Sequence, residues 1–316
     1  MTYALVTVVH PTDYTLLRLQ ARSLSRYLRL DSADEIWVIA NQGFHHRAAW
    51  QDPLRSDYGP LTDRVRFLDA PEVATIPDGT AGWLSQQILK LMVARVLTTD
   101  RYVVLDAKNH LVYPMSLDFF EVRGKLRSSR INYDGHSMRQ FLKRSVRYFG
   151  IDEHTVVNSF LPTITPFVFP TATVRTLIDT IAERELDTFP WSFCGINTTE
   201  FMLFGGYLCS LPGGIEGVYD LSSRACPAIW WDTATRGADA VESVIARVED
   251  ECLPFFTVHR HAAPLLDCRS KEAVASLWLR RHLFDSVERG LRFLTNLGNC
   301  ASTVISEPQP KASGSS

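Results

Sequence analysis

Two patterns of hydrophobic positions alternate along the first third of the chain. Short runs rich in β-branched and aromatic residues predict buried strands, and longer segments with leucines three or four positions apart predict amphipathic helices. The predicted strands cover residues 3–9, 36–40, 65–68 and 102–105, and the predicted helices cover residues 13–30 and 83–97. Because strand and helix alternate, we expect an α/β fold with a mixed, mostly parallel sheet flanked by helices.

The remaining two thirds are less regular. Helices are predicted over residues 139–148, which are strongly basic, and over residues 171–185 and 198–209. A last strand is predicted over residues 255–259, followed by one helical tail over residues 271–297. The polar end of the chain, residues 301–316, is predicted to be disordered.

The composition is that of an ordinary globular protein, with 46% hydrophobic and 22% charged residues. The formal charge of −2 gives no basic excess of the kind that nucleic-acid binding needs. No apolar run reaches the roughly 18 residues of a membrane helix, and the first residues lack a basic leader. The six cysteines have no metal-ligand spacing and are expected to be reduced, as in a cytoplasmic protein.

Three polar segments follow the predicted strands, at residues 10–13, 41–46 and 106–110. Parallel sheets bind their ligands at the carboxyl ends of the strands, so these segments are the first candidates for a site. Asp106 is costly inside a sheet but useful at its edge, and Lys108 can neutralise a phosphate as a point charge. The structural alternative is that Asp106 caps a turn and Lys108 is solvated.

The helix predicted at residues 83–97 carries Trp83, Gln86, Gln87 and Lys90 on one arc, because successive residues are about 100° apart. The other residues of this helix are apolar. A polar arc on a buried helix needs hydrogen-bond partners, which a nucleotide or its diphosphate would supply. The alternative is a patch of ordinary surface.

Glu200 begins another predicted helix, with Thr198 or Thr199 as its cap. The helix dipole favours an anion in the first turn, which is a sufficient structural reason for a glutamate there. The functional alternative is a general base that takes a proton from an acceptor hydroxyl.

Histidines and tryptophans are the other candidate ligand-binding residues. His259 ends the last predicted strand and could bind a metal ion or a phosphate, or lie in a solvated loop. Trp191, Trp230 and Trp231 stand in segments without a clear periodicity, which we interpret as loops. Exposed tryptophans stack on sugars, and burial in the core is the alternative.

Taken in order, these segments resemble a GT-A glycosyltransferase over about residues 3–262. The resemblance rests on a first strand ending in His10-Pro11, a Gln86-Gln87 helix that runs into a strand ending at Asp106, and the late strand before His259. Glu200 followed by Gly205-Gly206 completes the pattern. It is similar to a little-characterised bacterial group in which a Gln-Gln helix precedes Leu-Asp-Ala-Lys-Asn-His.

The resemblance implies a GT-A-like (Rossmann-like) fold that transfers a sugar from a nucleotide-sugar donor, above all a UDP-sugar. Inversion at the anomeric carbon is the expected outcome, and retention is an open alternative because the sequence does not fix the stereochemistry. The acceptor would be a glycan or a lipid-linked sugar in polysaccharide assembly. Contact with the inner face of the membrane is an open alternative, and no oligomeric state is implied. The implied organisation is a domain of residues 1–265 with a donor half (1–115) and an acceptor half (116–265), a helical extension (266–300) and a tail (301–316).

The resemblance also implies roles for single residues. The donor site would contain His10, Pro11, Asp13, Gln86, Gln87, Lys90 and Asn109. The catalytic residues would be Glu200 as base, Asp106 and Lys108, while Trp191, Trp230 and Trp231 would bind the acceptor. Asp106 matches the first acid of the usual metal motif, and His259 matches the histidine that completes the metal site.

Lys108 stands where such enzymes have a second acid. Two interpretations therefore stay open: a Mn²⁺ or Mg²⁺ site at Asp106 and His259, or a metal-independent site in which lysines hold the diphosphate. A non-catalytic nucleotide or glycan binding module on the same fold is a further alternative. A Rossmann dehydrogenase is disfavoured, because no Gly-x-Gly-x-x-Gly follows the first strand.

Overall fold

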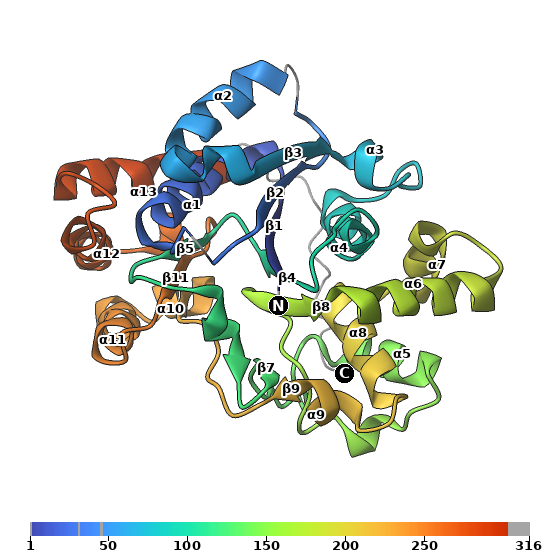
Figure 1. The fold of residues 1–316 in the computed structure, drawn as a ribbon. Helices are drawn as coiled ribbons and strands as arrows, with labels where there is room; N and C mark the ends of the chain where they lie inside the picture. Colours follow the sequence, from blue (N-terminus) through green and yellow to red (C-terminus); the bar gives the residue numbers. More distant parts are fainter. Residues whose placement is uncertain (1, 31, 45–46, 303–316) are drawn as a thin grey trace. The chain divides into compact units, whose positions relative to one another are not determined.

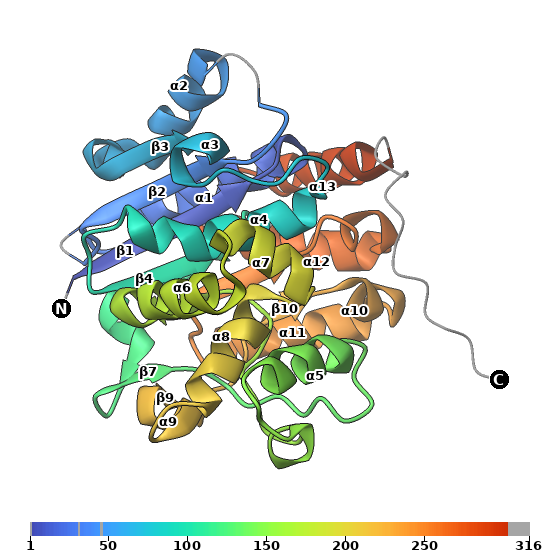
Figure 2. The same ribbon diagram turned by 90° about the vertical axis from the view of Figure 1, so that its right-hand side faces the viewer.

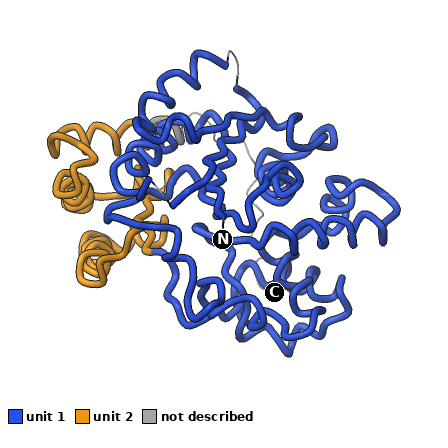
Figure 3. Tube along the Cα trace, viewed as in Figure 1, with its two compact units in different colours: residues 1–226 blue, residues 227–316 orange. Residues whose placement is uncertain are grey.

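The computed structural model describes residues 2–30, 32–44 and 47–302. The chain forms two compact units, residues 1–226 and residues 227–316 (Figure 3). The division into a donor half and an acceptor half at residue 115, and the domain end at residue 265, are functional boundaries that stay predictions.

A five-stranded sheet of order β3-β2-β1-β4-β8 forms the centre of the first unit. Its strands are β1 (Tyr3–Val9), β2 (Glu35–Ala40), β3 (Val65–Asp69), β4 (Arg101–Leu105) and β8 (Phe167–Pro170). The first four are parallel, and β8 runs antiparallel to β4. All seven residues of β1 are buried, as expected for a central strand covered on both faces. The predicted mixed, mostly parallel sheet is confirmed.

Helices cover both faces of this sheet. Figures 1 and 2 show α1 and α2 on one face and α4 and α6 on the other. The bounds are α1 (Tyr14–Tyr27), α2 (Arg47–Tyr58), α3 (Ala70–Val73), α4 (Gly82–Met92), α5 (Arg139–Tyr148), α6 (Thr171–Glu185), α7 (Phe189–Ile196), α8 (Glu200–Cys209) and α9 (Gly214–Val218). Short strands complete the unit at β5 (Asn109–Leu111), β6 (Glu121–Val122), β7 (Lys125–Arg127) and β9 (Tyr219–Asp220).

The amphipathic pattern of α1 sets its orientation. Leu16, Leu17, Leu19 and Leu24 are buried, and the helix ends where Leu28 turns to an extended conformation. It is therefore shorter than the predicted span of residues 13–30. The helix predicted at residues 83–97 is likewise shorter, because α4 ends at Met92 and passes into the 3₁₀ turn η3 (Val93–Arg95).

Two adjacent glycines let α8 pack closely against its neighbours. A Cβ atom at Gly205 would lie 2.6 Å from the Phe160 ring, and one at Gly206 would lie 3.1 Å from the backbone of Ser145 in α5. Real Cβ contacts are essentially never as short as that at Gly205, and a side chain at Gly206 would require its neighbour to move by a few tenths of an ångström. The close packing fixes α8, and with it the residue at its first turn.

The second unit contains a parallel pair, β10 (Ala228–Ile229) and β11 (Phe255–Val258). Its helices are α10 (Trp231–Thr235), α11 (Ala238–Asp250), α12 (Cys268–Arg280) and α13 (Val287–Ser302). The prediction of one continuous helical tail is wrong, because residues 281–286 turn the chain back. Trp278, Phe284 and Phe293 bury their rings together across that turn, at centroid distances of 5.2–5.5 Å.

None of the helices within the described ranges is long and apolar enough to cross a membrane. Cys194, Cys209, Cys252 and Cys268 carry free thiols. The segment predicted to be disordered falls mostly at residues 303–316, which lie outside the described residues.

Candidate active site

The carboxyl ends of β1 and β2 are joined to the start of α4. Asn41, directly after β2, donates from Nδ2 to the Gly82 carbonyl (3.0 Å) and accepts from the Ser85 hydroxyl (3.0 Å). Gln86 donates from Nε2 to the Val8 carbonyl of β1 (2.8 Å). These bonds hold the first turns of α4 at the strand ends where ligands of parallel sheets bind.

The predicted donor residues after β1 lie at the same edge. Pro11–Asp13 form a 3₁₀ turn, η1, and His10 caps it, with Nδ1 2.9 Å from the Thr12 hydroxyl. Gly43 has a φ of 91°, and a Cβ there would lie 3.4 Å from Pro11. The segments after β1 and β2 therefore touch each other, while residues 45–46 lie outside the described residues.

A buried ammonium group lies at the carboxyl end of β4. Lys90 Nζ donates to Asp106 Oδ1 (2.9 Å) and to Glu200 Oε1 (3.1 Å), and its side chain is only 5% exposed. Lys108 Nζ pairs with the other carboxylate oxygen of Asp106. We call Lys90, Asp106, Lys108 and Glu200 the lysine cluster. Its two positive and two negative charges compensate each other.

The electrostatics of the cluster follow from burial and pairing. Burial lowers the pKa of Lys90, but the charges of Asp106 and Glu200 outweigh burial and raise that pKa above its ordinary value. Burial raises the pKa of Asp106, but the two lysines hold it far below its usual range. Burial raises the pKa of Glu200, and Lys90 offsets only part of that rise.

Backbone and amide groups fix the Asp106 turn. The Asp106 N–H donates to Asn109 Oδ1 (2.8 Å), and Asn109 donates in turn to the Thr165 carbonyl (3.2 Å). Gln20 donates from Nε2 to the carbonyls of Asp106 (2.8 Å) and Asn109 (3.0 Å). Gln20 was not among the predicted site residues. A glutamine on the leucine face of α1 is nevertheless a usable signal, since a buried amide needs partners.

Gln87 connects α4 to α8. Its Oε1 accepts from the Glu200 N–H (3.2 Å), and Thr199 caps the helix by accepting from the Met202 N–H (3.2 Å), as predicted. Gln86, Gln87 and Lys90 thus have protein partners, so the expectation that the polar arc needs a ligand to satisfy it is wrong. Their part in donor binding stays a prediction. Trp83, on the same arc, is 51% exposed.

The residues at Asp106 do not fit a divalent cation. Both carboxylate oxygens already accept from ammonium groups, and two positive charges beside them repel a metal ion. Within the described residues, no three His, Cys, Asp or Glu side chains gather in a way that would hold a metal. The pairing of Asp106 with His259 stays a prediction, and no step below is routed through a metal.

His259 lies in an aromatic cluster of the second unit. Its ring centroid is 5.1 Å from Trp230, 5.6 Å from Trp231 and 5.3 Å from His261. These residues follow β10 and β11, so they share the carboxyl end of that parallel pair. The interpretation of the tryptophans as loop residues is wrong for two of them: Trp231 begins α10 and Trp191 lies in α7.

Comparison with known proteins adds a family and a fold. The model of a family described as a family of unknown function, DUF6492, matches residues 10–226. The chain belongs to this family. No curated protein is significantly similar to the chain in sequence.

Among solved structures, the galactosyltransferase LgtC in complex with donor and acceptor sugar analogs aligns over 93% of this chain and 96% of its own, with a TM-score of 0.50 and 11% identity. The likeness shows a GT-A-like fold, as the sequence resemblance implied. An active-site mutant of LgtC aligns with a TM-score of 0.45 and 11% identity, over 65% of this chain and 69% of its own. The bifunctional glycosyltransferase WbbM aligns with a TM-score of 0.40 and 12% identity, over 57% of this chain and 34% of its own.

Proposed function

We propose that the chain is a glycosyltransferase that moves a sugar from a nucleotide-sugar donor to a glycan or lipid-linked acceptor. The observation that carries the proposal is the lysine cluster at the carboxyl end of β4, on a GT-A-like fold. Catalytic sites of parallel α/β sheets occupy this edge. A UDP-sugar is the donor that the sequence resemblance favours, and a hexose the group transferred.

In the proposed reaction, the acceptor hydroxyl oxygen attacks the anomeric carbon on the face opposite the diphosphate. The bond from that carbon to the phosphate oxygen breaks, and its electron pair leaves with the nucleoside diphosphate. Lys108, at the rim of the cluster with 15% of its side chain exposed, stabilises the charge that develops on the diphosphate. The hydroxyl proton passes to a base.

Glu200 is the proposed base, and its position suggests a second role to be separated from the first. Its side chain is only 4% exposed and accepts from Lys90, so it also anchors that lysine. A base requires an ionised carboxylate that reaches the acceptor, whereas an anchor only has to hold Lys90 in place. A Glu200→Gln variant separates the roles: loss of a base lowers kcat at unchanged donor affinity, and loss of an anchor weakens donor affinity.

The test of donor binding is thermal unfolding with UDP, GDP, CMP, TDP and NAD, each with and without Mn²⁺. A ligand at 100 times its Kd adds about 2.7 kcal/mol to the free energy of unfolding. We expect one nucleoside diphosphate to stabilise the protein without Mn²⁺, and Lys108→Met to remove that effect. Lys143→Met, which changes an exposed lysine of α5, is the matched control. Stabilisation by NAD alone would contradict the proposal.

A non-catalytic nucleotide or glycan binding module is the second candidate. The observation in its favour is that the charged groups of the lysine cluster form ion pairs with one another. Incubation with the donor identified by thermal unfolding, followed by detection of free nucleoside diphosphate, distinguishes the two. Release of nucleotide from wild type but not from Lys108→Met supports the enzyme. Binding without any release in the presence of candidate acceptors supports the module.

A further inference from the structure

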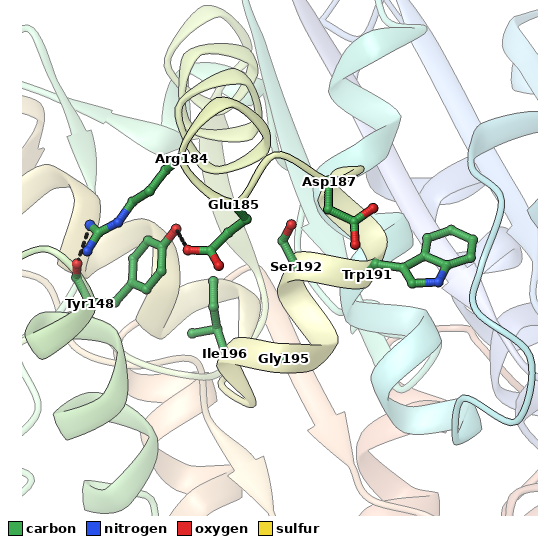
Figure 4. A pocket seen from close by; sticks show the side chains of 8 residues that line it. All are labelled: Tyr148, Arg184, Glu185, Asp187, Trp191, Ser192, Gly195 and Ile196. Atoms are coloured by element: carbon green, nitrogen blue, oxygen red, sulfur yellow. Dashed lines mark hydrogen bonds between the residues drawn. The ribbon is translucent and has the colours of Figure 1, made fainter.

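A hollow of about 560 Å³, open to solvent, lies between α5, α6 and α7 of the first unit (Figure 4). None of its lining residues belongs to the lysine cluster. Its volume falls within the range of small-molecule sites. The side chains that give it chemical character are Tyr148, Arg184, Glu185, Asp187, Trp191 and Ser192.

A left-handed turn builds one wall of the hollow. Leu186 ends α6 with a φ of 52° and an almost fully exposed side chain. Bulky residues rarely adopt this conformation, so the surrounding structure must enforce it. The reversal places the carboxylates of Glu185 and Asp187 on either side of the turn and leads directly into α7, which carries Trp191 (Figure 4).

The opposite wall is held by bonds among its own groups. The Tyr148 hydroxyl donates to Glu185 Oε1 (2.7 Å), and Arg184 donates to the Tyr148 carbonyl (2.6 Å). The Arg184 guanidinium also lies 4.3 Å from the centroid of the Tyr148 ring. Tyr148 thus engages both Arg184 and Glu185, whereas Asp187 Oδ1 accepts from the adjacent Thr188 N–H (2.6 Å). Asp187 is therefore the acceptor that the hollow offers most readily, since a carboxylate accepts several hydrogen bonds.

The lining carries two carboxylates and one guanidinium, a net charge of −1, which disfavours phosphates and other anions. Trp191 adds a flat apolar surface that is 42% exposed. A pyranose presents both matching features, an apolar C–H face that stacks on an indole and hydroxyls that donate to carboxylates. We propose that this hollow binds a neutral hexose unit of a glycan, with Trp191 under the sugar ring and Asp187 accepting from its hydroxyls.

The choice of a glycan as ligand rests on the proposed function, because a glycosyltransferase meets a glycan acceptor whose more distant sugars need a contact of their own. The hollow would be that contact. Since its lining residues take no part in the lysine cluster, it binds sugar whether or not transfer occurs.

Saturation-transfer NMR tests the proposal with neutral gluco-, galacto- and manno-configured oligosaccharides and no nucleotide present. We expect at least one oligosaccharide to bind. Trp191→Ala should weaken it about tenfold, the size expected for loss of an aromatic stacking surface. Asp187→Asn, which keeps the shape of the side chain, should weaken it about threefold. Trp83→Ala, an exposed tryptophan (51%) of α4, is the matched control and should change affinity by less than twofold. Trp231→Ala tests whether the sugar binds instead at the tryptophans of the second unit.

The proposal is overturned if none of the oligosaccharides binds, if Trp191→Ala binds as well as wild type, or if Trp231→Ala is the variant that loses binding. Tetramethylammonium is included as a cationic probe, since an indole beside carboxylates also attracts cations. Binding of that probe at Trp191, without any oligosaccharide, would replace the sugar assignment. Because the assay contains no nucleotide, its failure is distinct from failure of the proposed transferase activity, which thermal unfolding with nucleotides tests.

Discussion

Two charge clusters of the first unit have opposite arrangements. In the lysine cluster, a buried ammonium lies between two carboxylates. At α5, the buried carboxylate of Glu153 faces three cations, Arg139 (3.3 Å), Lys143 (3.5 Å) and Arg147 (3.9 Å), which are 35–66% exposed. Water and the remaining cations can compensate for the loss of one exposed cation. Loss of Lys90 instead removes the ammonium partner of the buried Glu200, and the pairing of Lys108 with Asp106 does not replace it. The position of a charge therefore decides its energetic weight more than the number of its partners does.

The strongly basic helix α5 is a surface on which an anionic membrane could bind, and its contacts bear on that alternative. Three of its cations face Glu153, and the fourth, Arg144, donates to the Asn197 carbonyl (3.0 Å). Its basic character is thus largely used within the protein. Contact with an anionic membrane stays a prediction, and vesicles containing anionic lipid test it directly.

The largest effect is expected for Lys90→Met. The change leaves the buried Glu200 carboxylate without its ammonium partner, while Asp106 keeps Lys108. Breaking a buried pair in this way costs about 3–5 kcal/mol. Urea unfolding measures the loss. The double variant Lys90→Met/Glu200→Gln should recover part of it, because one uncompensated charge is removed. A loss below about 1 kcal/mol in the single variant would show that the two clusters do not differ as described.

The second largest effect is expected for Glu200→Gln, on the rate of transfer. If Glu200 takes the acceptor proton, kcat falls by about 10²-fold or more, the usual contribution of a general base. Initial rates at saturating donor measure kcat, and nucleotide titration measures donor affinity. Unchanged kcat would remove Glu200 from the base role and leave it as the anchor of Lys90. Glu183→Gln, a change of an exposed glutamate of α6 that lines neither the lysine cluster nor the hollow, serves as the control.

The buried His110 makes the stability of the protein depend on pH. It is 1% exposed, and burial lowers its pKa from 6.5 to about 4. The unfolded chain therefore binds a proton between these values that the folded chain does not, so stability is greatest above pH 6.5 and falls as the pH drops toward 4. Between pH 7 and pH 5 this loss amounts to about 2 kcal/mol. Urea unfolding at both pH values should show a smaller loss in His110→Gln, and an equal loss in both proteins would refute the assignment.

The smallest effect is expected for Lys143→Met. Arg139 and Arg147 remain beside Glu153, and exposed ion pairs contribute little, so Tm should move by no more than about 2 °C. Differential scanning calorimetry at low and high salt measures it, and the shift should shrink with salt. A shift as large as that of Lys90→Met would mean that exposure does not separate the clusters.

The sequence predicted the sheet well because period and polarity are local signals. The spans of β1 and α6 coincide with the predicted residues 3–9 and 171–185. The tail was predicted as one helix because its apolar residues keep a helical spacing across residues 281–286. Contact between Trp278 and Phe293, fifteen positions apart, depends on the turn and leaves no local pattern.

The residues of the candidate site could be predicted from the sequence, but the contacts between them could not. Asp106, Lys108, Lys90 and Glu200 were all candidates from the sequence. Lys90 and Glu200 are 110 positions apart in the sequence, and their hydrogen bond depends on the packing of α4 against α8. As a result, residues that were expected to need a ligand as their hydrogen-bond partner bind other residues of the protein instead.

The glycine pair of α8 influences the geometry of the lysine cluster from a distance. Gly205 and Gly206 lie five and six residues beyond Glu200, about 7.5–9 Å along the helix axis at 1.5 Å per residue. A methyl group at Gly206 would push against the backbone of Ser145 and displace the helix by a few tenths of an ångström. Glu200, in the first turn of the same helix, would move with it, and its distance from Lys90 would change. Alanine at this position would thus change the geometry of the lysine cluster without altering any of its four side chains.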